Sequence, residues 1–127
     1  MSDFFFVVGN AEEVLPTLPE ASIDVVVTSP PYNNGTDYGE YKDSLPIQGY
    51  LQWISFVFYQ LERVIKPSGS FFLNLGWSAS NPWFASDVAN EARKVFTLQN
   101  KIAWVKSIAL GDEPCQGHLK PINSSRF

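Results

Sequence analysis

Short runs rich in apolar residues predict four strands in this chain. The runs lie at residues 4–8, 23–27, 70–75 and 101–105. Short apolar runs bounded by turn-forming residues are typical of buried strands, whereas half-exposed strands alternate apolar and polar positions. The run at 23–27 is of the kind found inside a parallel sheet that is covered on both faces.

Helical spacing of apolar residues fills the segments between the predicted strands. Asn10 is placed to cap a first helix, with Glu13 as its capping-box partner, and Pro16 and Pro19 keep that helix short. A long amphipathic helix is predicted over about 46–66 from the repeated positions of Tyr50, Leu51, Ile54, Phe58, Leu61 and Ile65.

Proline and glycine mark the ends of the later elements. Pro67 and Gly69 are expected to stop the long helix. Asn81 and Pro82 provide the start of another helix, whose apolar face is predicted to carry Phe84, Val88, Ala92 and Val95. The polar, glycine-bearing stretch 33–45 indicates a loop.

The element order β-α-β-loop-α-β-α-β predicts an α/β fold with a mainly parallel sheet and flanking helices. We expect one domain over 1–127, with an irregular tail at 111–127. Ligands of such sheets bind at the carboxyl ends of the strands. Three segments are predicted to meet there: residues 9–10, residues 28–33 and residues 74–77.

Composition narrows the function classes. The chain has 127 residues, 45% hydrophobic content and a net charge of −4. That charge argues against a self-sufficient nucleic-acid binder, because phosphate contacts need clustered Lys and Arg. A single cysteine excludes an internal disulfide. The apolar run at 4–8 is too short for a signal peptide or membrane span, so a soluble cytoplasmic protein is expected.

The most specific motif is Thr28-Ser29-Pro30-Pro31-Tyr32-Asn33, which directly follows the second predicted strand. Prolines lack an N–H, so this turn offers acceptors and few donors, in a fixed extended shape. The Ser29 hydroxyl and the Pro30 carbonyl are suited to accept from both protons of an aromatic amine. The Tyr32 ring can stack on a base that has been flipped out of the duplex.

This motif resembles the catalytic motif of amino-group DNA methyltransferases, which form N4-methylcytosine or N6-methyladenine from S-adenosylmethionine. Further stretches resemble other blocks of that family, namely Val8-Gly9-Asn10-Ala11, residues 38–43, residues 62–70 and residues 102–106. With the catalytic motif leading, the order is that of the permuted beta group. The resemblance implies a partial Rossmann-like methyltransferase fold that carries the N-terminal catalytic half.

The resemblance also implies site residues. Ser29, Pro30, Pro31 and Tyr32 would form the catalytic target-base site, while Asn10, Ala11 and Thr28 would bind S-adenosylmethionine, with no metal. Family members usually carry Asp where this chain has Asn10, whose amide oxygen can still accept from the cofactor's adenine. Serine as the first residue of the motif leans towards N4-cytosine as the target.

The family's glycine-rich cofactor segment and its DNA-recognition region are not found in these 127 residues. The resemblance therefore implies a C-terminally truncated catalytic portion, whose partners are DNA, a complementing C-terminal half or a second copy. Two alternatives stay open. The chain is an inactive fragment or oligomerising module, or it methylates RNA or a protein amide.

Other candidate residues are weaker. Asp37, Glu40 and Asp43 lie in the loop after the motif. They are placed to shape the site, but a solvated acidic loop is the simpler interpretation. Trp77 follows the third predicted strand and is expected either to wall a pocket or to pack. His118 and Cys115 lack the neighbours that zinc binding or nucleophilic catalysis requires.

Overall fold

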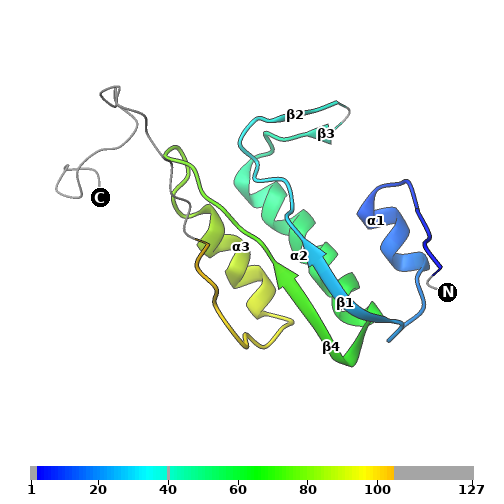
Figure 1. Cartoon of the computed structure of the whole chain (residues 1–127). Coiled ribbons are helices and arrows are strands. Elements are labelled where there is room, and N and C mark those ends of the chain that lie inside the picture. Colours follow the sequence, from blue (N-terminus) through cyan, green and yellow to red (C-terminus); the bar gives the residue numbers. More distant parts are fainter. Residues whose placement is uncertain (1–2, 40, 105–127) are drawn as a thin grey trace, which may run out of the picture.

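The computed structural model describes residues 3–39 and 41–104. Figure 1 shows a small parallel sheet beside two longer helices, with a short helical segment near the N-terminus. The elements are α1 (Ala11–Val14), the 3-10 helix η1 (Leu15–Thr17), β1 (Ile23–Thr28), β2 (Asp37–Tyr38), β3 (Tyr41–Lys42), α2 (Ile47–Val64), β4 (Ile65–Leu73) and α3 (Phe84–Arg93).

The main sheet consists of β1 and β4, which run parallel. Val25 pairs with Ser70 and Thr28 with Leu73, so the two carboxyl ends finish side by side. Helix α2 lies between the two strands in sequence and crosses back over the sheet, as parallel pairing requires. This confirms the predicted α/β class with a parallel sheet.

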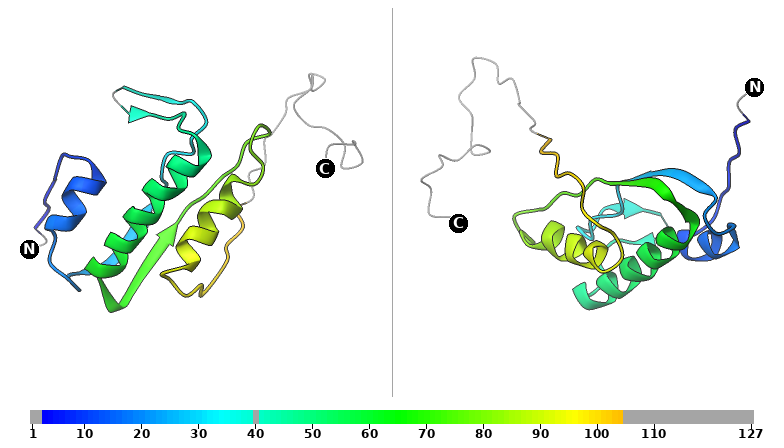
Figure 2. Two further views of the ribbon diagram at one scale, coloured as in Figure 1. Left: turned by 180° about the vertical axis from the view of Figure 1, so that it is seen from behind. Right: turned by 90° about the horizontal axis from the view of Figure 1, so that it is seen from below.

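The core lies between the sheet and helices α2 and α3, which both cover the same face (Figure 2, right). Helix α2 contributes most of it, because its apolar positions recur at helical spacing as the sequence predicted. On the sheet side, the Phe71 ring packs 5.7 Å from Phe58 and 4.9 Å from Phe96, measured between ring centroids. The buried hydrophobic residues are Tyr50, Ile54, Val57, Phe58, Leu61, Val64, Phe84 and Val88.

The opposite face of the sheet has no cover among the described residues. The side chains of Val25, Val27 and Phe72 are 55%, 74% and 52% exposed, respectively. The prediction that residues 23–27 form a strand is confirmed. The prediction that this strand is covered on both faces is wrong for the described chain.

Two predicted strands are not formed. Residues 4–8 have no regular structure, and Phe6 and Val8 are almost fully exposed. Residues 101–104 are likewise irregular and exposed, while Val105 lies outside the described residues. Both runs carry strand-like sequences, but a strand needs a neighbour to accept its hydrogen bonds, and no described strand lies beside either of them.

Glycine and proline act differently from the prediction around the start of β4. Helix α2 ends at Val64 and β4 begins at once, so Pro67 and Gly69 lie inside the strand. The pairing register shifts between Ile23 and Val25, and the resulting bulge in β4 contains Pro67 and Gly69. At Gly69 an added Cβ would lie 2.8 Å from the Asp24 carbonyl oxygen, so this bulge requires glycine.

The helix starts and the loop after the motif also differ from the prediction in detail. Asn10 occupies the N-cap of α1, but its side chain makes no capping bond, and its carbonyl accepts from the amides of Glu13 and Val14. The expected capping box is therefore absent. Helix α3 starts at Phe84, behind a Trp83 N-cap, rather than at Asn81. The predicted loop 33–45 contains a small antiparallel hairpin, β2–β3.

Candidate functional site

The ends of β1 and β4 bring three polar side chains together. The SPPY turn (Ser29, Pro30, Pro31 and Tyr32) follows β1, and Asn74 follows β4, where its amide donates to the Thr28 carbonyl at 2.9 Å. Asn74 Nδ2 lies 3.2 Å from both Ser29 Oγ and Tyr32 Oη, and these two hydroxyl oxygens are 3.0 Å apart. Two of the three segments predicted to meet at this edge do meet.

Proton counting shows what this trio can offer a ligand. Asn74 donates to both hydroxyls, and one hydroxyl donates to the other. Each hydroxyl has one proton and two lone pairs, so one proton and one lone pair remain for an incoming group. When Ser29 donates to Tyr32, the free lone pair is on Ser29. The exposed Ser29 hydroxyl can then accept from an amine.

The Tyr32 ring is held at one edge by Gly76. A Cβ added at Gly76 would lie 2.9 Å from Tyr32 Cε2, closer than side-chain contacts allow. The ring also packs against Phe84 of α3, with centroids 6.1 Å apart and a 59° tilt. Tyr32 is half-buried, so its ring is seated on the core while part of it stays accessible.

A hydrogen bond from the core holds the proline segment of the turn. Tyr50, which is fully buried on α2, donates through its hydroxyl to the Pro31 carbonyl at 2.6 Å. Pro30 is buried, in contrast to the exposed Ser29. Of these two residues of the turn, Ser29 is therefore the one whose hydroxyl lies on an exposed residue.

The acidic residues after the turn differ sharply from one another. Asp43 is only 3% exposed, and its carboxylate accepts hydrogen bonds from three backbone amides. A solvated loop is therefore the wrong interpretation for Asp43. Asp37 is exposed and accepts from the Gly39 amide, as hairpin residues often do. Glu40 lies outside the described residues.

The predicted cofactor residues do not all lie together. Thr28 ends β1 beside Asn74, but Asn10 and Ala11 are exposed at the start of α1. Figures 1 and 2 show α1 on the side of α2 that faces away from α3. In the described chain, no hydrogen bond joins Asn10 or Ala11 to the SPPY turn. The predicted meeting of residues 9–10 with the strand ends is not seen here.

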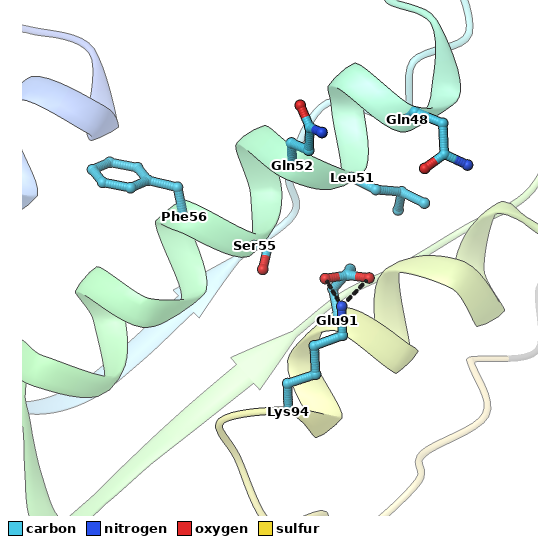
Figure 3. Close-up of a pocket in the computed structure, with 7 residues that line it drawn as sticks. All are labelled: Gln48, Leu51, Gln52, Ser55, Phe56, Glu91 and Lys94. Atoms are coloured by element: carbon cyan, nitrogen blue, oxygen red, sulfur yellow. Dashed lines mark hydrogen bonds and ion pairs between the residues drawn. The ribbon is translucent and has the colours of Figure 1, made fainter.

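An open groove of about 330 Å³ lies between α2 and α3 (Figure 3). The Glu91 carboxylate and the Lys94 amine form an ion pair at its rim, 2.6 Å apart. No predicted site residue lines the groove. Its lining residues are Gln48, Leu51, Gln52, Ser55, Phe56, Glu91 and Lys94.

Other predicted features can be placed briefly. Trp77 is 72% exposed, so it is not a core residue. His118 and Cys115 lie outside the described residues. Among residues 3–39 and 41–104, no group of three or more His, Cys, Asp or Glu is arranged to hold a metal ion. No helix in the same part of the chain has the length and apolar character needed to cross a membrane.

Sequence reasoning missed the individual supporting roles of Asn74, Gly76 and Tyr50, and it favoured a solvated loop over a site role for Asp43. Asn74 and Gly76 follow a predicted strand, and their place at the strand ends was the available signal. Tyr50 was assigned to the core, and the burial of its ring hides the separate role of its hydroxyl. Asp43 was a candidate for shaping the site, but its amide partners belong to backbone whose path the sequence does not reveal.

Comparison with known proteins gives consistent matches. Residues 23–126 match the family model described as DNA methylase, of the N6/N4 methyltransferase type. The type II methyltransferase M.BglII of Bacillus subtilis is 42% identical over 69 residues, which is 54% of this chain. M.SfiI of Streptomyces fimbriatus is 37% identical over 130 aligned positions, covering 88% of this chain.

The name of a third relative states its target base. The DNA adenine methyltransferase YhdJ of Escherichia coli is 26% identical over 96 residues, or 76% of this chain. The matched segments are 18%, 31% and 31% of the M.BglII, M.SfiI and YhdJ lengths. The chain thus spans under a third of each of these three relatives.

Proposed function

The chain belongs to the N6/N4 DNA methylase family, and from this premise we propose that its SPPY turn is the target-base site of a DNA amino-methyltransferase. The product would be N4-methylcytosine or N6-methyladenine. The observation that carries the proposal is the Ser29–Tyr32–Asn74 hydrogen-bonded trio at the carboxyl ends of β1 and β4. Ligands of parallel sheets bind at that edge.

Each residue of the turn would have a separate role in binding the base. Ser29 Oγ would accept from one amine proton when its own proton is donated to Tyr32 Oη. The accessible part of the Tyr32 ring would stack on the flipped base, a contact worth roughly 1–3 kcal/mol. The second amine proton is left for the Pro30 carbonyl once the base enters the site. Catalysis would then rest on orientation, since a serine hydroxyl is a poor base at neutral pH.

S-adenosylmethionine, when bound, supplies an electrophilic methyl group to the amine. Asn10 fits a role in holding it, because its side-chain amide is not used for capping and lies exposed. Ala11 and Thr28 are the other proposed contacts. These three residues lie at the start of α1 and at the end of β1, and this chain would hold only part of the cofactor.

The partner would be a polypeptide that covers the outer face and free edge of β1. Val25, Val27 and Phe72 are exposed there, and the apolar run at 4–8 is exposed as well. The proposed occupant is the cofactor-binding half of the methyltransferase, with residues 1–127 as the catalytic half of a single domain. The setting would be the modification arm of a cytoplasmic restriction-modification system, as the type II names of the relatives suggest.

Cytosine N4 is the favoured target. A serine hydroxyl supplies one neutral acceptor, and serine in the first motif position leans towards cytosine in the resembled family. The name of the YhdJ relative keeps N6-adenine as the second candidate.

The test is methyl transfer after complementation. The 127-residue chain is mixed with a separately produced cofactor-binding half of a relative, labelled S-adenosylmethionine and mixed-sequence DNA. We expect label in N4-methylcytosine or N6-methyladenine, and loss of that label with Tyr32→Ala. The control Tyr59→Ala removes an exposed tyrosine of α2 and should leave transfer unchanged.

The outcomes separate the alternatives. Label in RNA or protein would redirect the substrate class while keeping the site. No transfer from wild type, despite a complex with the second half, would contradict the enzyme function and leave an oligomerising module. The exposed apolar face supports that second candidate, and light scattering on the chain alone would measure its self-association.

A further inference from the structure

The loop after Tyr32 closes around one buried carboxylate. Asp43 accepts from the backbone amides of Asn33 at 2.9 Å, Asn34 at 3.0 Å and Thr36 at 2.9 Å. The remaining amide of the loop, that of Gly35, donates to the Asp43 carbonyl oxygen at 2.7 Å. Four consecutive N–H groups are therefore bound by a single residue that is 3% exposed.

This arrangement needs an unusual backbone path. Asn33 has φ +53° and Gly35 has φ +82°, both in the left-handed region. Such turns point successive N–H groups inwards and form a concave anion site, which the Asp43 carboxylate fills. The Asn33 side chain adds two bonds to Leu45, donating to its carbonyl at 2.8 Å and accepting from its amide at 2.7 Å.

Tyr32 is thus held on both sides along the chain. The peptide before it is fixed by the bond from the Tyr50 hydroxyl to the Pro31 carbonyl. The peptide after it is fixed because the Asn33 amide is bound to the Asp43 carboxylate. A tyrosine with both neighbouring peptides fixed has few orientations left for its ring, which must also pass Gly76 closely.

We propose that Asp43 is a positioning residue of this site. Its carboxylate sets the direction in which the chain leaves Tyr32, and this keeps the ring against Gly76 and the hydroxyl beside Ser29 and Asn74. Asp43 contacts neither Tyr32 Oη nor Ser29 Oγ, so it acts only through the loop. The proposal rests on the proposed function in one respect, which is that the ring is held for a target base.

The test compares Asp43→Asn with Asp37→Asn in the full chain. Asp43→Asn keeps the shape but replaces one acceptor oxygen by a donor that faces amides. Charged hydrogen bonds are strong, so we expect the amides of Asn33, Asn34 and Thr36 to exchange with deuterium about tenfold faster or more. Amides of α2 should keep their protection. Asp37→Asn changes an exposed residue of the same loop and should alter none of these.

Ring contacts provide a readout that does not depend on any ligand. In wild type, NMR should show cross-peaks from the Tyr32 ring to Gly76 and Phe84, and Asp43→Asn should weaken them. Added 2′-deoxycytidine should shift the Tyr32 ring signals, with roughly tenfold weaker binding in the variant, in proportion to the loosened loop. If Asp43→Asn does not fold, Asp43→Glu replaces it in the test. This variant moves the carboxylate by one methylene and should cause the same faster amide exchange, weaker ring cross-peaks and weaker nucleoside binding.

Three results would overturn the positioning role. The loop amides would stay protected in both variants, or they would be released while the Tyr32 cross-peaks persist, or α2 would lose protection by the same factor. Absence of any nucleoside shift in wild type would instead contradict the target-base site. The exchange and ring-contact results would then still decide the role of Asp43.

Discussion

The SPPY turn and the outer face of the β1–β4 sheet differ in how completely their residues contact the rest of the chain. Around the SPPY turn, the described polar side chains are joined in one network, and even the Pro31 carbonyl has a donor. On the outer face, Val25, Val27 and Phe72 are exposed, and residues 4–8 are largely exposed as well. The SPPY turn, which is the proposed base site, is thus hydrogen-bonded within this chain, whereas the outer face of the sheet is open among the described residues.

The difference separates two functions that a methyltransferase combines. The proposed orientation of the target amine would depend on short-range contacts between β1, β4, α2 and the 33–36 loop, which the described residues make. The proposed binding of the methyl donor would depend on Asn10 and Thr28, which lie at the start of α1 and at the end of β1. We therefore expect substitutions at the turn to change base recognition, and substitutions on the open face to change association.

The largest effect is expected from Gly76→Ala. The new methyl group would lie 2.9 Å from Tyr32 Cε2 and would force the ring to move. Because stacking contributes roughly 1–3 kcal/mol, displacing the ring should cost about tenfold or more in nucleoside affinity and in complemented methyl transfer. NMR titration with 2′-deoxycytidine measures the first of these.

Gly49→Ala is the matched control, because a Cβ at Gly49 of α2 would contact nothing within 4 Å. It should leave binding unchanged and stabilise the helix slightly, by up to about 1 kcal/mol. Equal affinity in the Gly76→Ala protein and wild type would contradict the view that the Tyr32 ring is placed for a base.

Tyr50→Phe should have the next largest effect. It removes the hydroxyl that donates to the Pro31 carbonyl and leaves that acceptor without its buried donor. The expected cost is roughly 1–3 kcal/mol in the free energy of unfolding, and urea denaturation measures it. Tyr59→Phe removes an exposed hydroxyl from the same helix and should be neutral. If the two variants were equally stable, the fixed peptide before Tyr32 would lose its support.

On the open face, Val27→Lys should weaken association with the complementing half. Val27 is 74% exposed here, and burying it would contribute roughly 1.5–3 kcal/mol, which is at least a tenfold change in affinity. The stability of the chain alone should hardly change. Phe56→Lys, on the helix that covers the other face, is the control. Unchanged association with Val27→Lys would show that the partner binds elsewhere.

The smallest effect belongs to Tyr32→Phe. The ring stays, but Ser29 and Asn74 each lose one hydrogen-bond partner at a partly solvated position. Neutral hydrogen bonds contribute about 1 kcal/mol, so a loss of about fivefold in nucleoside affinity is expected, in the same titration. Complete loss would indicate that the hydroxyl, rather than the ring face, recognises the base.

Sequence patterns predicted the parts of this fold whose cause is local. The spacing of Tyr50, Ile54, Phe58 and Leu61 marked α2, and the apolar run before Thr28 marked β1. The runs at 4–8 and 101–104 have the same local character but no described neighbour, and a strand cannot form on propensity alone. Proline and glycine at 67 and 69 were misinterpreted because a bulge requires the same residues as a helix stop.

In the candidate site, too, the features with a local cause were predictable and those that depend on distant contacts were not. The SPPY turn was recognisable because its residue types carry the chemistry themselves. Asn74, Gly76 and Asp43 contribute through where the fold places an amide, an absent side chain and a carboxylate. Asn74 and Gly76 depend on neighbours 42 to 45 positions away, and Asp43 depends on a left-handed loop, so no local pattern encodes these contacts.

Photocrosslinking tests the central claim most directly. A single-stranded oligonucleotide that carries 5-iodocytosine is bound to the full chain, irradiated, and the crosslinked residue is identified by mass spectrometry. The chain offers several aromatic competitors, among them Trp77 and Trp83, both 72% exposed. We expect the crosslink to form on Tyr32 and to be lost in Tyr32→Ala. Crosslinks confined to the exposed tryptophans would contradict the SPPY turn as the base site.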